Sequence, residues 1–123
     1  MFGGRDIDTG DVLDTVCIYD IAMDKWSKSK IPQPRCRFGC VKYYNYAIIM
    51  CCDDDSYADC NDIFVYNLES NKCNKQKLSL PKKAYGMAAT IIKNEIHLFG
   101  GASNYDCLND HVIITLRYLT KEK

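Results

Sequence analysis

The densest group of side chains that could do chemistry is the acidic segment DDDSYADCND, residues 53–62, because closely spaced carboxylates suit hard cations such as Ca²⁺. Counted from Asp53, a calcium loop of the EF-hand type needs glycine at its sixth position and glutamate at its twelfth. Ala58 and Phe64 stand there instead. We therefore expect a solvated, negatively charged loop available to a partner. Its candidate contact residues are Asp53, Asp54, Asp55 and Tyr57.

Known catalytic motifs do not occur in the sequence. It contains no G-x-S-x-G and no H-E-x-x-H, and no paired glycine is followed by the lysine of a phosphate-binding loop. The two histidines, His97 and His111, fall in strand-like runs, where isolated histidines are usually packing or surface residues. The sequence therefore favours a protein that is not an enzyme, and it predicts no cofactor and no metal.

Eight cysteines are the one unusual count in the composition. Zinc sites use close pairs such as C-x₂-C, and this sequence has none. A secreted disulfide framework requires a signal peptide, and the first residues show no basic region followed by an apolar one. We expect free and mostly buried thiols in a cytoplasmic protein.

Charge and hydropathy exclude two classes of partner. Sixteen basic and sixteen acidic residues cancel, so no global field attracts nucleic acid or an anionic membrane. The longest apolar runs, such as residues 47–52, are far too short to span a bilayer. The 123 residues, 47% of them hydrophobic, suit one globular domain whose partner is another protein.

A repeat of about 48 residues organises the chain. Asp14, Asp62 and Asp110 stand 48 residues apart, and each opens an apolar stretch. The Gly-Gly pairs of Phe2-Gly3-Gly4 and Phe99-Gly100-Gly101 are matched midway by Met50-Cys51-Cys52. Phe38-Gly39 answers Tyr85-Gly86 at a spacing of 47. The second copy is therefore a degenerate version of the other two.

Each repeat is patterned as strands. GMAATIIKNEIHLFGG, residues 86–101, contains two β-rich runs separated by Lys93-Asn94-Glu95, which predicts a hairpin. A polar loop follows, then a third run such as DIFVYNLE and a fourth such as KCNKQKLSL or DKWSKSKI. No segment keeps the apolar spacing of a helix. Four short antiparallel strands in each repeat predict an all-β fold of propeller blades.

These motifs resemble the kelch-repeat family of β-propellers. The matching elements are the apolar run closed by Gly-Gly, the pair Tyr19 and Trp26 with six residues between them, and the PQPR segment that leads into the next repeat. The resemblance implies a partial kelch-type propeller of four-stranded antiparallel blades. Residues 1–34 are then the second half of a blade, residues 35–81 a full blade, and residues 82–123 an incomplete blade. Cys51-Cys52 and Cys73 depart from the glycine pair and the tryptophan that the pattern expects.

Repeated residues are expected to serve structure. Paired glycines suit turns that need a left-handed backbone, and large rings suit the gap between adjacent blades. The structural positions are Gly3, Gly4, Tyr19, Trp26, Gly39, Tyr66, Gly86, Gly100 and Gly101.

Two arginines are the main candidates for partner binding. In kelch substrate adaptors of ubiquitin ligases, arginines in a G-G-R stretch and at the second arginine of P-R-x-R-x-G line a pocket for acidic peptides. By this resemblance the positions are Arg5 and Arg37, whereas Arg35 is structural. A guanidinium group can bind a carboxylate through two hydrogen bonds, which gives the expectation a mechanism.

The resemblance implies a noncatalytic protein-interaction module, either a substrate adaptor of a ubiquitin ligase or a cytoskeletal or scaffold contact. The alternative is a fragment of a kelch-type copper oxidase or sugar epimerase whose active-site residues lie outside this chain. So few blades leave edges and apolar faces uncovered. We therefore expect the chain to need further blades or self-association.

Overall fold

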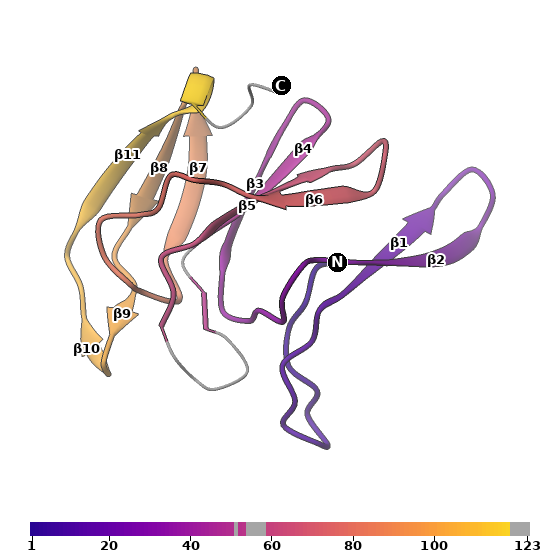
Figure 1. Cartoon of the computed structure of the whole chain (residues 1–123), viewed down its shortest axis with the longest axis horizontal. Coiled ribbons are helices and arrows are strands. Elements are labelled where there is room, and N and C mark those ends of the chain that lie inside the picture. The colour runs from indigo at the N-terminus through magenta and orange to yellow at the C-terminus, as the bar shows by residue number, and fades with distance from the viewer. Residues whose placement is uncertain (51, 54–58, 119–123) are drawn as a thin grey trace.

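The computed structural model describes residues 1–50, 52–53 and 59–118 (Figure 1). Within these residues the fold is all-β and its strand pairings are antiparallel, as the sequence predicts. No helix in this part of the chain is long and apolar enough to cross a membrane. The elements are β1 (Thr15–Asp20), β2 (Lys25–Lys30), β3 (Gly39–Tyr43), β4 (Tyr46–Met50), β5 (Ile63–Asn67), β6 (Lys72–Lys75), β7 (Ala88–Ile92), β8 (Glu95–Phe99), β9 (Ala102–Ser103), β10 (Asp106–Cys107), β11 (His111–Thr115) and the 3-10 turn η1 (Leu116–Tyr118).

Three sheets carry the fold. Strands β1 and β2 form sheet 1, β3 to β6 form sheet 2 in sequential order, and β7, β8 and β11 form sheet 3 with β8 in its centre. Strands β9 and β10 make a separate small hairpin. Sheet 2 lies between the other two, and none of these described sheets closes on itself (Figure 1). The four antiparallel strands expected within residues 35–81 are therefore present in sheet 2.

Both faces of sheet 2 are buried, which explains why β4 and β5 read as continuous apolar runs rather than as alternating ones. One face packs on sheet 1, in a cluster of buried Val16, Ile31, Ala47, Ile49, Phe64 and Tyr66. The other face packs on sheet 3, where the cluster includes Val41, Ile48, Met50, Ile63, Val65, Ile96, Leu98 and Ile114. Two hydrophobic cores therefore hold three sheets together.

Short turns recur at equivalent places. Strands β3 and β4 are joined at Tyr44, and β7 and β8 at Lys93, and both residues have a left-handed φ, of 50° and 56°. The predicted hairpin at residues 93–95 is confirmed, except that Glu95 already belongs to β8.

A second kind of turn is stabilised by a tyrosine. The hydroxyl of Tyr66 donates to Oδ1 of Asn71 at 3.1 Å, and the hydroxyl of Tyr19 donates to Oδ1 of Asp24. In each case the acceptor lies five residues after the tyrosine and has a left-handed φ. Tyr19 and Tyr66 are therefore equivalent residues of successive sheets.

Their burial differs from the expectation. Tyr66 is 1% exposed, whereas Tyr19 is 43% and Trp26 is 69% exposed. Within the described residues, Tyr19 and Trp26 do not pack between two sheets, so that prediction is wrong for both. The reason is that they lie on the face of sheet 1 that is turned away from sheet 2, and they contact each other across β1 and β2 with ring centroids 5.0 Å apart.

The register between the second and third repeats also corrects the sequence alignment. Cys36 pairs with Asp53 just before β3, and Tyr85 pairs with Ala102 just before β7. Both members of these pairs are 49 residues apart, so Gly86 is equivalent to Arg37, not to Gly39. The dipeptides Phe38-Gly39 and Tyr85-Gly86 match in residue type at a spacing of 47, but their glycines do not occupy equivalent positions in the structure.

Gly39 has a packing role of its own. It lies within β3, and a Cβ there would come within 3.2 Å of the Cβ of Ala89 on sheet 3. The paired glycines instead adopt left-handed φ, and a Cβ on Gly3 or Gly101 would overlap backbone oxygens. The glycines with positive φ at the structural positions are Gly3, Gly4, Gly86, Gly100 and Gly101.

Candidate functional site

Loops from successive repeats gather at one end of the sheets. The segment that contains Arg5, the described parts of the connection from β4 to β5, and the β9–β10 hairpin all lie at the lower end in Figure 1. The chain also enters β3 and β7 at this end, and Cys60 pairs with Ala84 between two of the loops. Side chains distant in sequence therefore meet here.

Arg37 occupies a strained position at the start of β3. Its φ is 49°, a conformation that costs a residue with a Cβ about 1 kcal/mol or more. The neighbouring Cys36 exchanges two backbone hydrogen bonds with Asp53, at 3.1 and 2.9 Å. This pairing fixes the backbone beside Arg37 and places the Asp53 carboxylate within its reach.

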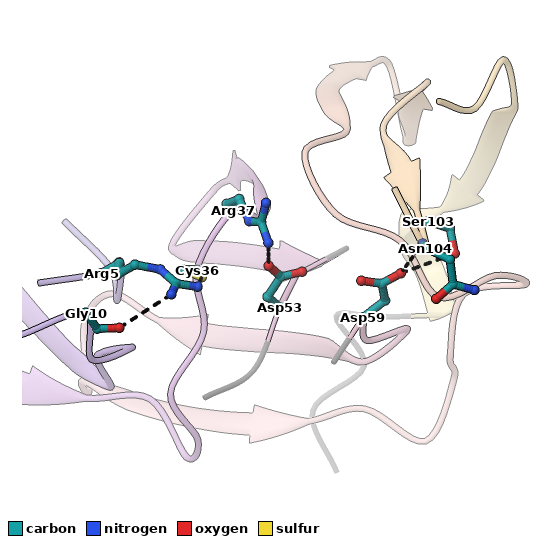
Figure 2. Close-up of polar contacts among 8 residues, drawn as sticks. All are labelled: Arg5, Gly10, Cys36, Arg37, Asp53, Asp59, Ser103 and Asn104. Atoms are coloured by element: carbon teal, nitrogen blue, oxygen red, sulfur yellow. Dashed lines mark hydrogen bonds and ion pairs between the residues drawn. The ribbon is translucent and has the colours of Figure 1, made fainter. Parts of the chain in front are cut away.

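The guanidinium of Arg37 contacts two of the described residues. Its Nη2 donates to Oδ2 of Asp53, and its Cζ lies 4.0 Å from the ring centroid of Tyr85 (Figure 2). Burial lowers the pKa of Arg37, but the hydrogen bond and charge of Asp53 outweigh it and leave this pKa above its ordinary value. About half of the side chain stays exposed.

Asp53 differs from the solvated residue that the sequence predicts. Its side chain is fully buried, and Oδ1 has no hydrogen-bond partner among the described residues. Asp53 therefore forms an ion pair with Arg37 from a buried position and is not part of a charged surface.

A cavity of about 310 Å³ lies beside Arg37. Described side chains of the second and third repeats line it together, and among them are two cationic groups, two phenol rings and several hydrogen-bonding groups. The lining residues are Arg37, Asp59, Lys83, Tyr85, Ser103, Asn104 and Tyr105.

Asp59 fixes the wall of this cavity opposite Arg37. Its Oδ2 accepts hydrogen bonds from Oγ of Ser103 at 3.2 Å and from the backbone N–H of Asn104 at 3.0 Å (Figure 2). Asn104 and Tyr105 both have a left-handed φ, so the β9–β10 turn projects the ring of Tyr105 outward, where it is 93% exposed. One carboxylate thus orders the loop that carries the strongly exposed ring of Tyr105.

Arg5 lies at the same end but does not line the cavity. Its Nη1 donates to the carbonyl of Gly10 at 3.4 Å, and its Nη2 donates to Sγ of Cys36 at 3.5 Å (Figure 2). Arg5 therefore contacts the residue that precedes Arg37, so the structure brings the two predicted arginines onto neighbouring parts of one end.

Arg35 is buried, in agreement with its predicted structural role. It is 4% exposed, it donates to Oδ2 of Asp62 at 3.0 Å, and its Cζ lies 5.2 Å from the ring centroid of Phe64. The other predicted contact residues of the acidic loop, Asp54, Asp55 and Tyr57, lie outside the described residues.

Sequence reasoning missed Lys83 and Tyr105 as site residues. The correct register of 49 residues would have placed the segment around Lys83 next to the Gly-Gly loop of its own repeat, as Cys36 lies next to Asp53. The Asn104-Tyr105 turn was visible only as a turn signal, because its contact with Asp59 joins residues 45 apart.

The described residues of the cavity lining offer hydrogen-bond donors, the cations Arg37 and Lys83, and the aromatic faces of Tyr85 and Tyr105. In the part of the chain that the structure describes, no group of three or more His, Cys, Asp or Glu residues is arranged to hold a metal ion.

Comparisons with known proteins do not assign this chain to a family: no family model and no curated protein matches it.

Proposed function

We propose that this chain is a noncatalytic protein-interaction module of the kelch type, and that the cavity beside Arg37 binds an acidic segment of a partner protein. Sheets 1, 2 and 3 then correspond to parts of three successive propeller blades. A cytoplasmic adaptor or scaffold protein fits this role.

The observation that carries the proposal is the meeting of two repeats around one cavity. Arg37 and Asp59 come from the second repeat, and Lys83, Tyr85 and Tyr105 come from the third. Loops held by rigid sheets are common binding surfaces, because the sheets fix the positions of the side chains. A peptide seated here contacts both repeats.

The charges of the lining favour an acidic peptide. Among the lining residues that the structure describes, Lys83 and the ion-paired Arg37 carry positive charge, and the carboxylate of Asp59 accepts hydrogen bonds from Ser103 and Asn104. The half-exposed side chain of Arg37 can donate to a carboxylate, and the rings of Tyr85 and Tyr105 can pack against the neighbours of that carboxylate.

The test uses an array of nine-residue peptides that carry glutamate or aspartate at varied spacing, with the matching glutamine and asparagine peptides as references. We expect the chain to bind a subset of the acidic peptides and none of the amide versions. Lys83→Ala and Tyr105→Ala should each weaken binding at least fivefold, as measured by fluorescence polarisation.

Tyr44→Ala is the matched control for Tyr105→Ala. Tyr44 is also an exposed tyrosine with a left-handed φ, but it lies in the β3–β4 turn at the opposite end. It should leave peptide affinity unchanged. Equal loss of affinity in both variants, or equal binding of acidic and amide peptides, would contradict the proposal.

A further inference from the structure

In this chain, each sheet packs on the next one through the same pair of faces. We call the face of a sheet that packs on the next sheet its leading face, and the opposite face its trailing face. The leading face of sheet 1, with Val16, packs on the trailing face of sheet 2, with Phe64 and Tyr66. The leading face of sheet 2, with Ile48 and Met50, packs on sheet 3 in the same way.

The leading face of sheet 3 is uncovered and apolar within the described chain. Its residues alternate with the buried Ile96, Leu98 and Ile114. Ile92, Phe99 and Ile113 on this face are 51%, 44% and 52% exposed. The strands of sheet 2 that are equivalent to β8 and β11 are β4 and β5, and these are buried on both faces.

A stack of rings lies at the centre of this leading face. The rings of Phe99 and His111 lie 4.4 Å apart, and His97 joins His111 through a hydrogen bond of 2.9 Å between Nδ1 and Nε2. The carboxylate of Glu95 lies beside them, 3.5 Å from Nε2 of His97. The face is therefore aromatic and aliphatic, with a carboxylate beside the rings.

Among the described residues, none covers the trailing face of sheet 1 either. It presents Tyr19 and Trp26, together with the exposed Lys28 and Lys30 of β2. Tyr66 shows what covers such a face: it is equivalent to Tyr19, and it is buried under sheet 1 with its ring 5.0 Å from the ring of Phe2. Within the described residues, no sheet covers Tyr19 in the way that the leading face of sheet 1 covers Tyr66.

We propose that two copies of this chain associate head to tail, with the leading face of sheet 3 in one copy packed on the trailing face of sheet 1 in the other. The contact continues the series of sheet contacts inside the chain. It places aliphatic and aromatic groups against Tyr19 and Trp26, and it brings Glu95 toward the lysines of β2.

Such a contact is heterologous, because it joins two different faces. Heterologous contacts form rings or open chains and do not stop at a pair unless the ring closes. This surface is separate from the Arg37 cavity, so its failure would leave the proposed peptide binding intact.

The experiment uses two variants of the full chain that each block one face. Ile113→Asp disables the leading face, and Trp26→Asp disables the trailing face. Ile7→Asp is the control, because Ile7 is a 97% exposed isoleucine in the loop between Arg5 and Val12, on neither face. Circular dichroism confirms that each variant is folded, and sedimentation velocity at about 1 to 100 µM measures mass.

We expect the natural chain and Ile7→Asp to associate as concentration rises, and each face variant alone to stay monomeric. A mixture of the two face variants should form a one-to-one pair, since each retains the face that the other lacks. Ile92→Asp replaces Ile113→Asp if the latter fails to fold. A monomeric natural chain, self-association of either face variant alone, or a mixture that stays monomeric would overturn the proposal.

Discussion

The backbone N–H of Gly86 donates a hydrogen bond of 2.8 Å to the carbonyl oxygen of Arg37, and the two residues hold equivalent places in successive repeats. Both have a left-handed φ, 68° at Gly86 and 49° at Arg37. Only Gly86 meets this requirement without strain. The side chain at position 37 is therefore kept in a conformation that its backbone disfavours.

Comparing Arg37→Gly with Arg37→Ala separates backbone strain from the side-chain contacts. Both variants leave Asp53 buried without its partner, so both should unfold more easily than the natural chain. The glycine variant should be more stable than the alanine variant by about 0.5 to 1 kcal/mol, because glycine relieves the left-handed strain. Urea unfolding measures this, and an alanine variant of equal or greater stability would contradict it.

Gly101→Ala should destabilise the chain more than Gly100→Ala. Both residues have a positive φ, but a Cβ on Gly101 would lie 2.8 Å from the carbonyl oxygen of Tyr85, whereas the nearest atom to a Cβ on Gly100 lies at 3.5 Å. The overlap adds about 1 to 3 kcal/mol to the cost of the φ alone. Thermal unfolding of the two variants tests the order, and equal melting temperatures would refute the role of the overlap.

Asp62 should make stability depend on pH in the acid range. Burial raises the pKa of Asp62, but hydrogen bonds from Lys75 and Arg35 outweigh it and bring the pKa below its ordinary value. The stabilisation is therefore present above the ordinary pKa of an aspartate and is lost as pH falls through the lower pKa of the folded state. Asp62→Asn should cost about 1 to 2 kcal/mol at pH 7.

The control for Asp62→Asn is the pH series itself. The difference in unfolding free energy from the natural chain should shrink as pH falls below about 4, where Asp62 takes up a proton first in the unfolded chain and then, at lower pH, in the folded one. A difference that stays constant down to pH 2 would show that the ionised carboxylate is not what stabilises the fold.

Cys73 should react slowly with an alkylating reagent. Burial raises the pKa of its thiol to about 11, so little thiolate is present at pH 8. Cys107 in the β9–β10 hairpin is exposed and serves as the internal reference. After a short pulse of iodoacetamide, peptide mass spectrometry should find Cys107 modified well before Cys73, and in guanidinium the two should react alike. Equal rates in the folded chain would contradict this.

Local patterning was enough to predict the strands, because hairpins depend on neighbouring residues. The apolar runs on either side of Lys93 and Asn94 predict β7 and β8, and the runs of the second repeat predict sheet 2. The exposure of Trp26 could not be predicted, since it depends on which face of sheet 1 meets sheet 2. A repeat pattern identifies equivalent residues, but it does not say which of them has a neighbouring sheet.

The candidate site was harder to predict than the strands. Its contacts join distant residues, such as Asp59 with Asn104 and Arg37 with Tyr85. Asp53 stands in a run of acids that indicates a solvated loop, yet its pairing with Cys36 draws it inward. The sequence pointed to Arg37 and to Asp53 separately, but not to the ion pair between them.

The order of strands also bears on how quickly the chain can fold. Four hairpins, β1–β2, β3–β4, β5–β6 and β7–β8, are closed by turns of only two or four residues. Short closures cost little chain entropy, and local contacts speed folding. Each hairpin can therefore begin folding by itself, and the slower steps are the pairings across the longer connections, β4 with β5 and β8 with β11, and the docking of one sheet on the next.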